Sequence, residues 1–263
     1  MIKAELLNKF AKDGEQRTQL ARVLDQMQRA DTRSIPCATQ FLSPALRASV
    51  ELLLDACGHP KHRFCGGYED AERTVCVFLP HWQEAEDYVA DEELAAVSAA
   101  FPRQANLTHR DILGGLMGIG ITREKLGDIL MGDHEAQIVC LREALPIVLS
   151  QFSQAGRYPL KLQEIPLSQL SPAPQTVKEI HDTVATLRLD AVVASGFSLS
   201  RSKASQLITT GRVSVNHLEC LKTDRLVEEG DVLTCRGLGK CVLAQVGGQS
   251  RKGRIILTLH RYV

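Results

Sequence analysis

The start of the chain alternates apolar and polar residues with the period of an α-helix. Residues 4–29 place apolar side chains three or four positions apart, which is the spacing of one face of a helix. Ser43 and Pro44 then suit the N-cap and the first turn of a further helix, and Gly58 suits its end. The pattern predicts a helical N-terminal domain over residues 1–62.

The middle of the chain changes to short apolar runs separated by glycine, proline and polar residues, which is typical of strands. The predicted strands are, in chain order, 74–79, 94–101, 126–131, 136–140 and 158–165. Thr108 suits the N-cap of an intervening helix, with Asp111 placed for a capping box, and a second helix is predicted over 141–154. The order strand-strand-helix-strand-strand-helix-strand favours an α+β sandwich over residues 63–165, with helices on one face of the sheet.

The last part of the chain follows its clearest linker, residues 166–181, where proline and polar residues are frequent. The pattern of residues 182–263 predicts two short helices followed by short strands. The second helix begins at Ser200, a good N-cap, and ends at Gly211. A final hairpin turns near residues 247–253, which include two cations: Arg251 and Lys252.

Charge is distributed unevenly along a chain whose formal net charge is zero at pH 7. Residues 182–263 hold 12 Lys and Arg against 7 Asp and Glu, whereas residues 1–181 hold 19 against 24. A basic domain attached to an acidic body favours a polyanion as the partner of the basic domain. Modest imbalances of this kind are common, so the local arrangement of the cations has to support the argument.

The start of the helix at Ser200 combines features that suit a phosphate backbone. Its first N–H groups have no partner within the helix and lie at the positive end of the helix dipole. Ser202 adds a hydroxyl, and Arg201 and Lys203 add positive charge. We therefore predict an RNA-binding surface that consists of Arg188, Ser200, Arg201, Ser202, Lys203, Arg212, Asn216, Arg236 and Lys240.

The scarcity of aromatic residues in this domain favours structured RNA as the partner. Only Phe197 and Tyr262 are aromatic there. Proteins that bind single strands stack the bases on aromatic side chains. Recognition of the shape and the backbone of a folded RNA therefore fits the composition better.

Each predicted contact also has a purely structural interpretation. Arg201 and Lys203 could form only a solvated helix face, and the serine could act only as a cap. Arg188 could pair with Asp190 or Glu228. The prediction fails if the structure scatters these side chains over unrelated faces, or engages them in ion pairs with carboxylates of their own domain.

The motifs of this region resemble the S-four domain, the RNA-binding domain named after the fourth protein of the small ribosomal subunit. The matching segments are Leu187-Arg-Leu-Asp, Ser200-Arg-Ser-Lys-Ala-Ser, Gly211-Arg-Val-Ser-Val-Asn, Gly230-Asp and Arg236-Gly-Leu-Gly-Lys. Earlier segments resemble hallmarks of the YlmH family: Phe41-Leu-Ser-Pro, Gly66-Gly-Tyr-Glu-Asp-Ala-Glu-Arg, Leu107-Thr-His-Arg-Asp-Ile-Leu-Gly and Ile121-Thr-Arg-Glu-Lys-Leu-Gly-Asp-Ile-Leu. With them the resemblance extends over nearly the whole chain.

The YlmH resemblance implies an α+β protein with three domains. These are an N-terminal helical domain, a central ferredoxin-like domain similar to an RNA-recognition motif, and a C-terminal αL-type S-four domain with a small β-sheet. The implied partner is ribosomal RNA or tRNA on the large ribosomal subunit. Some members are linked to rescue of stalled ribosomes, and others to cell division or photosystem assembly.

The central domain lacks the aromatic-rich strand of an ordinary RNA-recognition motif. Four polar residues of this domain are the better candidates for a second RNA-binding surface: His109, Arg110, Arg123 and Lys125. The alternative is that these residues only begin a helix or form a turn.

The competing hypothesis is an RNA-modifying enzyme related to pseudouridine synthases, which also carry S-four domains. Such an enzyme needs a catalytic aspartate in a Gly-Arg-Leu-Asp-type segment of a large catalytic domain, whereas Asp190 lies in the S-four helix. The sequence shows no synthetase signature, no Walker loop and no evident nucleophilic triad. We expect no catalytic residue, no cofactor and no small-molecule substrate. An adaptor that binds proteins through its acidic N-terminal part is compatible with RNA binding.

Eight cysteines without a Cys-x-x-Cys pair are most simply reduced core residues. Cys57, His59, His62 and Cys65 are residue types that bind zinc, but their spacing matches no common finger and Pro60 interrupts it. A polar loop is the simpler interpretation, and a metal there stays open.

No apolar run approaches the ~20 residues of a membrane helix, and the N-terminus has no signal-peptide core. We therefore expect a cytoplasmic protein without membrane contact.

Overall fold

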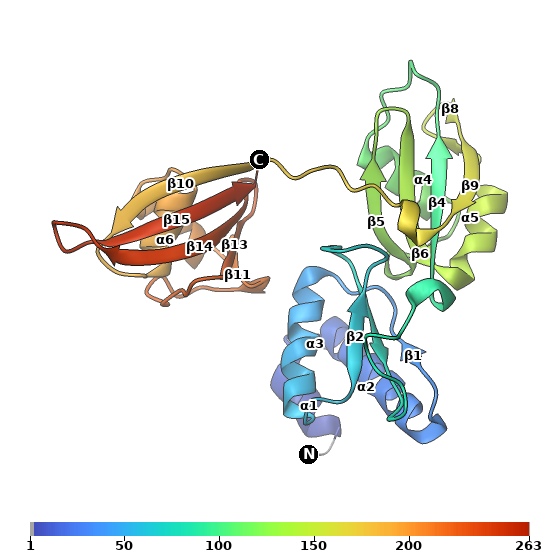
Figure 1. Ribbon diagram of the computed structural model, residues 1–263, viewed down its shortest axis with the longest axis horizontal. Helices are drawn as coiled ribbons and strands as arrows, with labels where there is room; N and C mark the ends of the chain where they lie inside the picture. Colours follow the sequence, from blue (N-terminus) through green and yellow to red (C-terminus); the bar gives the residue numbers. More distant parts are fainter. Residues whose placement is uncertain (1–2, 263) are drawn as a thin grey trace. The chain divides into compact units, whose positions relative to one another are not determined.

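The computed structural model describes residues 3–262 and divides the chain into two compact units, Met1–Ala173 and Pro174–Val263. We call these the first unit and the second unit and describe each by itself (Figure 1). Residues 1, 2 and 263, at the ends of the first and the last predicted domain, lie outside the described residues.

The N-terminal part of the first unit combines helices with a small antiparallel sheet. Its elements are α1 (Lys3–Phe10), α2 (Gly14–Arg33), β1 (Cys37–Ala38), α3 (Pro44–Ala56), β2 (His62–Cys65) and β3 (Val75–Phe78). The single helix expected over 4–29 is two helices, because Asp13 caps a new one by accepting a hydrogen bond from the Gln16 N–H at 2.8 Å. The start of α3 is confirmed, since Ser43 caps it by accepting from the Leu46 N–H at 3.3 Å.

The strand β3 lies at its predicted position but belongs to the N-terminal sheet, so the domain boundary placed after residue 62 is wrong. The sheet order is β1-β3-β2, and β3 pairs antiparallel with both neighbours. Cys76 and Phe78 pack with α2 and α3. Val75 and Val77 point to the opposite face and pack with the central part of the unit. A strand covered on both faces is apolar throughout, and such a run does not reveal which sheet it joins.

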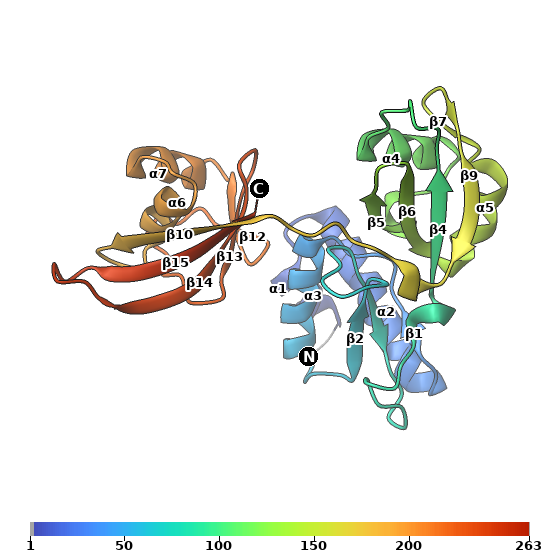
Figure 2. The same ribbon diagram turned by 45° about the horizontal axis from the view of Figure 1, so that its top comes forward.

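The central part of the first unit is a four-stranded antiparallel sheet with two helices on one face (Figure 2). Its elements are η1 (Ala90–Glu92), β4 (Leu94–Ala100), α4 (His109–Gly118), η2 (Arg123–Lys125), β5 (Leu126–Met131), β6 (Glu135–Leu141), η3 (Arg142–Ala144), α5 (Leu145–Gln151), β7 (Gln154–Ala155), β8 (Tyr158–Pro159), β9 (Lys161–Ile165) and η4 (Leu167–Gln169). The strand order is β5-β6-β4-β9. Ile112 of α4 and Val148 of α5 share a core with Val97 of β4. The predicted capping box at the start of α4 is confirmed, since the Thr108 N–H donates to the Asp111 carboxylate at 2.8 Å.

The second unit packs two helices on one face of a six-stranded sheet (Figure 2). Its elements are β10 (Val177–Val184), α6 (Leu189–Gly196), α7 (Arg201–Thr209), β11 (Val213–Val215), β12 (Leu218–Glu219), β13 (Val232–Cys235), β14 (Gly239–Gln249) and β15 (Ile255–Tyr262). The strand order is β10-β15-β14-β13-β11-β12, antiparallel throughout. Val193 of α6 and Ile208 of α7 are fully buried in one core with Leu257 and Leu259 of β15.

The strand β10 corrects the predicted linker over 166–181 and the predicted domain start at residue 182. It pairs with β15 along its whole length, from Val177 opposite Tyr262 to Val184 opposite Ile255. β10 is the edge strand of the sheet, and most of its side chains are exposed. It is held in the sheet mainly by backbone hydrogen bonds to β15. A strand of that kind leaves no alternating apolar pattern in the sequence.

Among residues 3–262, no helix has both the length and the apolar character that crossing a membrane requires.

Candidate nucleic-acid interface

The helices α6 and α7 begin close together, and the carboxylate of Asp190 lies between their first residues. Arg188, the N-cap of α6, donates to Asp190 through Nε and Nη2, both at 3.2 Å. Arg201, the first residue of α7, donates to the same carboxylate through Nε and Nη2, both at 3.2 Å. One carboxylate therefore holds two guanidinium groups side by side. We call Arg188, Asp190 and Arg201 the Asp190 cluster.

The exposure of the three side chains differs in a way that matters for binding. The Asp190 side chain is 7% exposed, whereas those of Arg188 and Arg201 are 35% and 57% exposed. The carboxylate therefore lies beneath the surface and the guanidinium groups cover it. Within the cluster two positive charges face one negative charge, and the exposed Asp224 of a neighbouring loop adds a second negative charge that acts on Arg188.

The ionisation of Asp190 follows from these contacts. Burial alone raises the pKa of the Asp190 carboxyl, because it disfavours the charged form. The hydrogen bonds and charges of Arg188 and Arg201 outweigh burial and hold this pKa below its ordinary value. Asp190 is therefore ionised at neutral pH, as the paired arrangement requires.

The Asp190 cluster differs from the row of free cations that the sequence predicts. Arg188 pairs with Asp190, which is one of its two structural interpretations. Arg201 pairs with the same carboxylate but stays mostly exposed. Both arginines therefore form ion pairs within their own domain, which counts against the predicted RNA-binding surface for these two residues. What remains available is the outer edge of each guanidinium group.

The start of α7 carries the other cations and hydroxyls that the sequence predicts there. The Ser200 hydroxyl accepts a hydrogen bond from the Lys203 N–H at 3.2 Å and so caps the helix. Ser202 and Lys203 are exposed, and the Lys203 ammonium donates to the Gln206 side chain at 3.0 Å. The predicted buried stripe of the helix is confirmed: Ala204, Leu207 and Ile208.

The start of α6 is closed by a loop that the sequence analysis did not include. The Leu189 N–H donates to the Arg225 carbonyl at 2.8 Å, and the Asp190 N–H donates to the Thr223 carbonyl at 3.0 Å. This loop brings the exposed residues Lys222, Asp224 and Arg225 to the start of α6, and the Asp224 charge acts on Arg188. Their separation of more than thirty residues from Arg188 left no local signal of that proximity.

The predicted residues beyond α7 form a separate group. The Arg212 Nη2 donates to the Arg236 carbonyl at 2.9 Å, and the Lys240 ammonium lies 4.0 Å from the centre of the Tyr262 ring. Arg212 lies just beyond the C-terminal end of α7 at Thr209, whereas Arg201 is its first residue. The nine residues of α7 extend about 13 Å at the usual rise, so the predicted residues occupy two ends of one helix.

Asn216 is engaged within its own turn. Its amide Nδ2 donates to Asp231 at 2.7 Å, and its Oδ1 accepts from the Val232 N–H at 2.8 Å. Its φ of 50° lies in the left-handed region, which asparagine tolerates better than most residues. These contacts give Asn216 a role in joining β11 to β13.

The second predicted surface, in the first unit, divides into two pairs. His109 and Arg110 are exposed on the first turn of α4. Arg123 is half-buried and donates to the Gly127 carbonyl at 3.2 Å. Lys125 forms an ion pair with Glu143 at 3.0 Å. The structure therefore leaves the first pair facing solvent and uses the second pair within the unit.

A second carboxylate, that of Asp128, joins the N-terminal and central parts of the first unit. It accepts hydrogen bonds from the Tyr68 hydroxyl at 2.9 Å and from the N–H groups of Glu72 and Arg73 at 2.8 and 3.2 Å. Burial raises the pKa of Tyr68 above its ordinary value, and the Asp128 charge adds to this. We call these residues the Asp128 network.

Arg73 completes the Asp128 network by donating to backbone carbonyls of the central part. Its Nε reaches the Leu126 carbonyl at 2.8 Å and its Nη2 reaches the Arg123 carbonyl at 2.9 Å. Burial lowers the pKa of Arg73 to about 10. Two segments with YlmH-like motifs, residues 66–73 and 121–130, therefore meet to hold the unit together.

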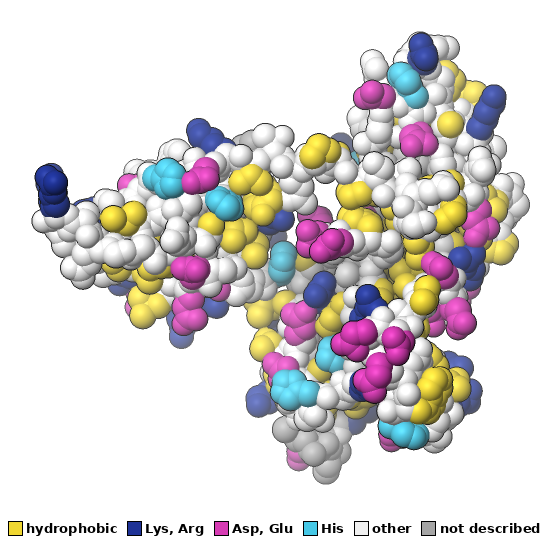
Figure 3. All heavy atoms as spheres, viewed as in Figure 1, with side chains coloured by type: hydrophobic (Ala, Val, Ile, Leu, Met, Phe, Trp, Pro, Cys, Tyr) yellow, Lys and Arg dark blue, Asp and Glu magenta, His cyan; other side chains and the backbone are white. Residues whose placement is uncertain are grey.

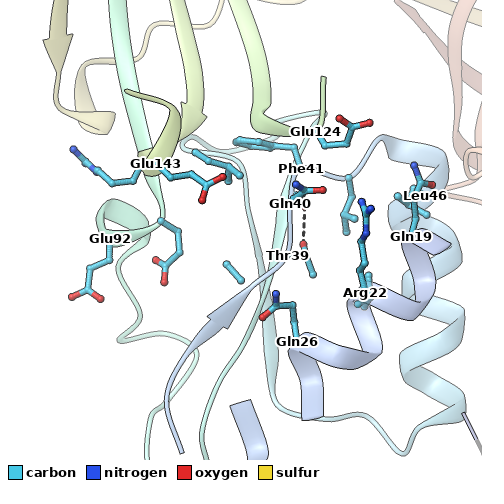
Figure 4. A pocket seen from close by; sticks show the side chains of 16 residues that line it. Gln19, Arg22, Gln26, Thr39, Gln40, Phe41, Leu46, Glu92, Glu124 and Glu143 are labelled. Carbon is cyan, nitrogen blue, oxygen red and sulfur yellow. Dashed lines mark hydrogen bonds between the residues drawn. The ribbon is translucent and has the colours of Figure 1, made fainter. Parts of the chain in front are cut away.

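A cavity of about 730 Å³ also lies between the two parts of the first unit (Figure 4). One wall comes from α2 with Gln19, Arg22 and Gln26, and Glu124 and Glu143 belong to the opposite wall. The charged residues of its lining include both arginines and glutamates.

The cysteine and histidine residues of the sequence do not assemble into a metal site within residues 3–262, where no group of three potential ligands is close enough. His59 pairs with Asp55 at 3.2 Å, and the His62 Nδ1 lies 2.7 Å from the Pro60 carbonyl.

Comparison with known families gives three matches along the chain. They are "YlmH, N-terminal" over residues 15–78, "Putative RNA-binding domain in YlmH" over 86–169 and "S4 domain" over 187–233. The S4 domain is the S-four domain of the sequence analysis. The first match ends at the last residue of β3, in agreement with the corrected boundary.

Individual relatives extend this result. "Ribosome-associated protein quality control protein P2" of Bacillus subtilis (strain 168) is 36% identical over 199 residues, which cover 75% of this chain and 77% of the relative. The solved structure of "Cell division protein ylmH from Streptococcus pneumoniae" has a TM-score of 0.48 and 23% identity, covering 60% of this chain and 94% of the other. That structural likeness is too distant to support an argument about the fold.

Proposed function

The chain belongs to the YlmH family, and from that premise we propose that it is a non-enzymatic protein that recognises structured RNA through its second unit. We also call this the S4 unit, because it contains the S4 match. The RNA is ribosomal RNA or tRNA on the large ribosomal subunit, and the process is rescue of stalled ribosomes in the cytoplasm. The name of the Bacillus subtilis relative, which refers to ribosome-associated quality control, supports the process.

The Asp190 cluster is the observation that carries the proposal. A guanidinium group held by two hydrogen bonds to a buried carboxylate has lost most of its freedom before the RNA arrives. Binding then costs little additional side-chain entropy. The outer N–H groups of Arg201 are free to donate to a phosphate oxygen, and arginine–phosphate bonds are among the stronger charge-assisted hydrogen bonds. Lys203 follows Arg201 on the same helix turn, and the loop that closes the start of α6 carries Lys222 and Arg225 together with Asp224.

The central part supports a more limited role in RNA binding. Its strand–helix–strand–strand–helix–strand order and its sheet order β5-β6-β4-β9 support the ferredoxin-like arrangement. In an RNA-recognition motif the bases stack on the sheet face opposite the helices. Here Leu94 and Val139 of that face pack against the N-terminal part. The exposed residues His109 and Arg110 are therefore the better candidates for contact in this unit.

The test is the salt dependence of RNA binding by the full chain. The logarithm of the association constant should fall with the logarithm of salt concentration by about 0.9 for each phosphate neutralised. The variant Arg201→Gln with Lys203→Gln should reduce that slope by about 1 to 2 on a folded fragment of large-subunit ribosomal RNA. Lys12→Gln with Arg103→Gln, two exposed residues of the first unit, makes the same change of charge as a control.

Three outcomes would contradict the proposal. A salt-independent interaction, or equal effects of the two double variants, would remove the role of the S4 unit. Chemical modification of naked RNA by the purified chain would favour the alternative, an enzyme related to pseudouridine synthases. Sedimentation of the chain with free large subunits in a sucrose gradient is the expected result for the ribosomal partner.

A further inference from the structure

The final segment of the second unit is positively charged and has no acidic residue. Residues 232–263 contain six Lys and Arg and no Asp or Glu. The Asp190 cluster, by contrast, is partly neutralised by its own carboxylate. No carboxylate within this segment offsets its positive charge, and the acids that neighbouring segments bring to its strands lie away from the turn at 250–253: Glu179 and Asp182 on β10 and Glu229 at the Val246 N–H.

Two of these cations lie at the end of the hairpin formed by β14 and β15. The turn is closed by hydrogen bonds from the Ser250 N–H to the Arg254 carbonyl at 2.7 Å and from the Gly253 N–H to the Ser250 carbonyl at 2.9 Å. Arg251 and Lys252 lie between these bonds and are exposed. Neither makes an ion pair or a side-chain hydrogen bond within the described part of the chain. Figure 3 shows Lys and Arg side chains at this end of the hairpin, which projects beyond α6 and α7 in Figure 2.

The fold does not require the side chains of Arg251 and Lys252. Residues 247–254 contain no buried side chain. Gly248 and Gly253 have no atom within 4 Å of the position where a Cβ would lie, so nothing inside the protein demands glycine for space. Two adjacent positive charges repel each other and so offer the folded state no benefit. Their placement is better explained by an anionic partner.

The base of the hairpin is fixed to its neighbouring strand. The Arg254 Nε donates to the Thr183 hydroxyl at 3.0 Å, and its Nη2 donates to the Thr183 carbonyl. Val184 pairs with Ile255 immediately beyond the turn. The cations are therefore presented from an anchored support rather than from a free loop.

We propose that Arg251 and Lys252 form a second phosphate contact, which binds the same RNA as the Asp190 cluster. The inference rests on the proposed function and extends it to residues beyond the S4 match, which ends at residue 233. Three residues separate Val184 from Arg188, so their Cα atoms are at most ~14 Å apart. Since Val184 pairs with Ile255 at the hairpin, one folded RNA can reach both contacts.

The test compares double variants of the full chain on the same folded ribosomal RNA fragment. Arg251→Gln with Lys252→Gln should lower the salt slope by about 1 to 2, weaken binding at least about threefold at low salt and leave the melting temperature unchanged. Arg251→Glu with Lys252→Glu should weaken binding further. Lys12→Gln with Arg103→Gln again serves as the control with equal change of charge.

The outcomes separate this inference from the proposed function. If Arg201→Gln with Lys203→Gln weakens binding but the hairpin variant behaves like the control, the hairpin contact is refuted and the proposed function stands. If the unaltered chain binds no RNA, both are refuted. A loss of affinity that comes with a lower melting temperature in the glutamine variant would show a structural role and overturn the inference.

Discussion

Each unit of this protein has a carboxylate that organises arginines, and the two carboxylates use them in opposite ways. Asp128 in the first unit accepts from backbone N–H groups and from Tyr68, while the neighbouring Arg73 donates to backbone carbonyls. Asp190 in the second unit accepts from the side chains of Arg188 and Arg201. In the first unit the Arg73 guanidinium donates its hydrogen bonds to backbone carbonyls. In the second unit the guanidinium groups of Arg188 and Arg201 cover the carboxylate and face solvent.

The difference explains why cations of similar appearance in the sequence are not equivalent candidates for RNA binding. Arg123 and Arg201 both follow a hydroxyl residue at the start of a helical turn. Arg123 is half-buried with its guanidinium directed to the Gly127 carbonyl, and desolvation lowers its pKa. Arg201 keeps more than half of its side chain exposed, at 57%. A cation can contact phosphate only when its own fold leaves donors at the surface.

The largest expected effect concerns the Asp128 network. Asp128→Ala should destabilise the first unit by about 3 kcal/mol, because several donors lose their acceptor together. Urea denaturation measures the change, and hydrogen exchange should place it in the first unit only. Asp133→Ala, an exposed position in the following turn, is the control. Equal stability of the two variants would mean that the network does not hold the two parts together.

The second effect concerns Asp190 and depends on pH. Asp190→Asn should destabilise the second unit by about 2 kcal/mol at pH 7, since the two arginines lose a charged acceptor. Because the folded pKa of Asp190 is lowered, its stabilising contribution is present above the ordinary carboxyl pKa of about 3.9. It is lost as the pH falls through the folded value.

Denaturation of the Asp190→Asn variant at pH 7 and pH 3 checks this prediction. The difference in free energy of unfolding between the variant and the unaltered protein should be smaller at pH 3 than at pH 7. Glu228→Gln, an exposed acid of the same unit, should show little difference at either pH. A difference that stays constant with pH would mean that the ion pairs contribute nothing.

A smaller effect distinguishes the geometry of the Asp190 cluster from its charge. Arg201→Lys keeps the charge but cannot form two parallel bonds to the carboxylate. RNA affinity in an anisotropy titration should fall about fivefold, or ~1 kcal/mol, while the salt slope is nearly unchanged. Lys203→Arg, an exposed neighbour without a carboxylate partner, should have little effect. Full affinity in Arg201→Lys would show that only the charge matters.

The smallest effect concerns α4 and has the opposite sign. Gly114 lies inside this helix with no atom near its missing Cβ, whereas a Cβ on Gly115 would lie 2.6 Å from the Phe152 ring. Gly114→Ala should therefore stabilise the first unit by about 0.5 kcal/mol, and Gly115→Ala should destabilise it. Thermal unfolding measures both. If Gly114→Ala also weakens RNA binding, the exposed face of α4 joins His109 and Arg110 as a contact surface.

Local sequence signals predicted the helix starts because their determinants lie within a few residues. Ser43, Thr108 and Ser200 each stand where the structure begins a helix. A cap satisfies N–H groups of the next turn, so its evidence is contained in the local sequence. The same holds for the buried stripe of α7 and for the segments that resemble known motifs.

Features that depend on residues distant in the sequence could not be predicted from local patterns. β10 is held by backbone bonds to β15 about eighty residues later in the chain, and its exposed side chains carry no pattern. β3 was recognised as a strand, but its sheet was not, because both of its faces are buried. The proximity of Lys222 and Arg225 to α6 likewise depends on backbone bonds made by a loop.

The sequence by itself therefore determined the family, the start of α7 at Ser200 and the surplus of positive charge near it. Only the tertiary structure decided which of those charges stay at the surface, since it placed the Asp190 carboxylate between Arg188 and Arg201 and left Arg251 and Lys252 without a carboxylate. The physical reason is that a charge is fixed by the residue type, whereas its availability depends on burial and on neighbours that folding brings from elsewhere in the chain.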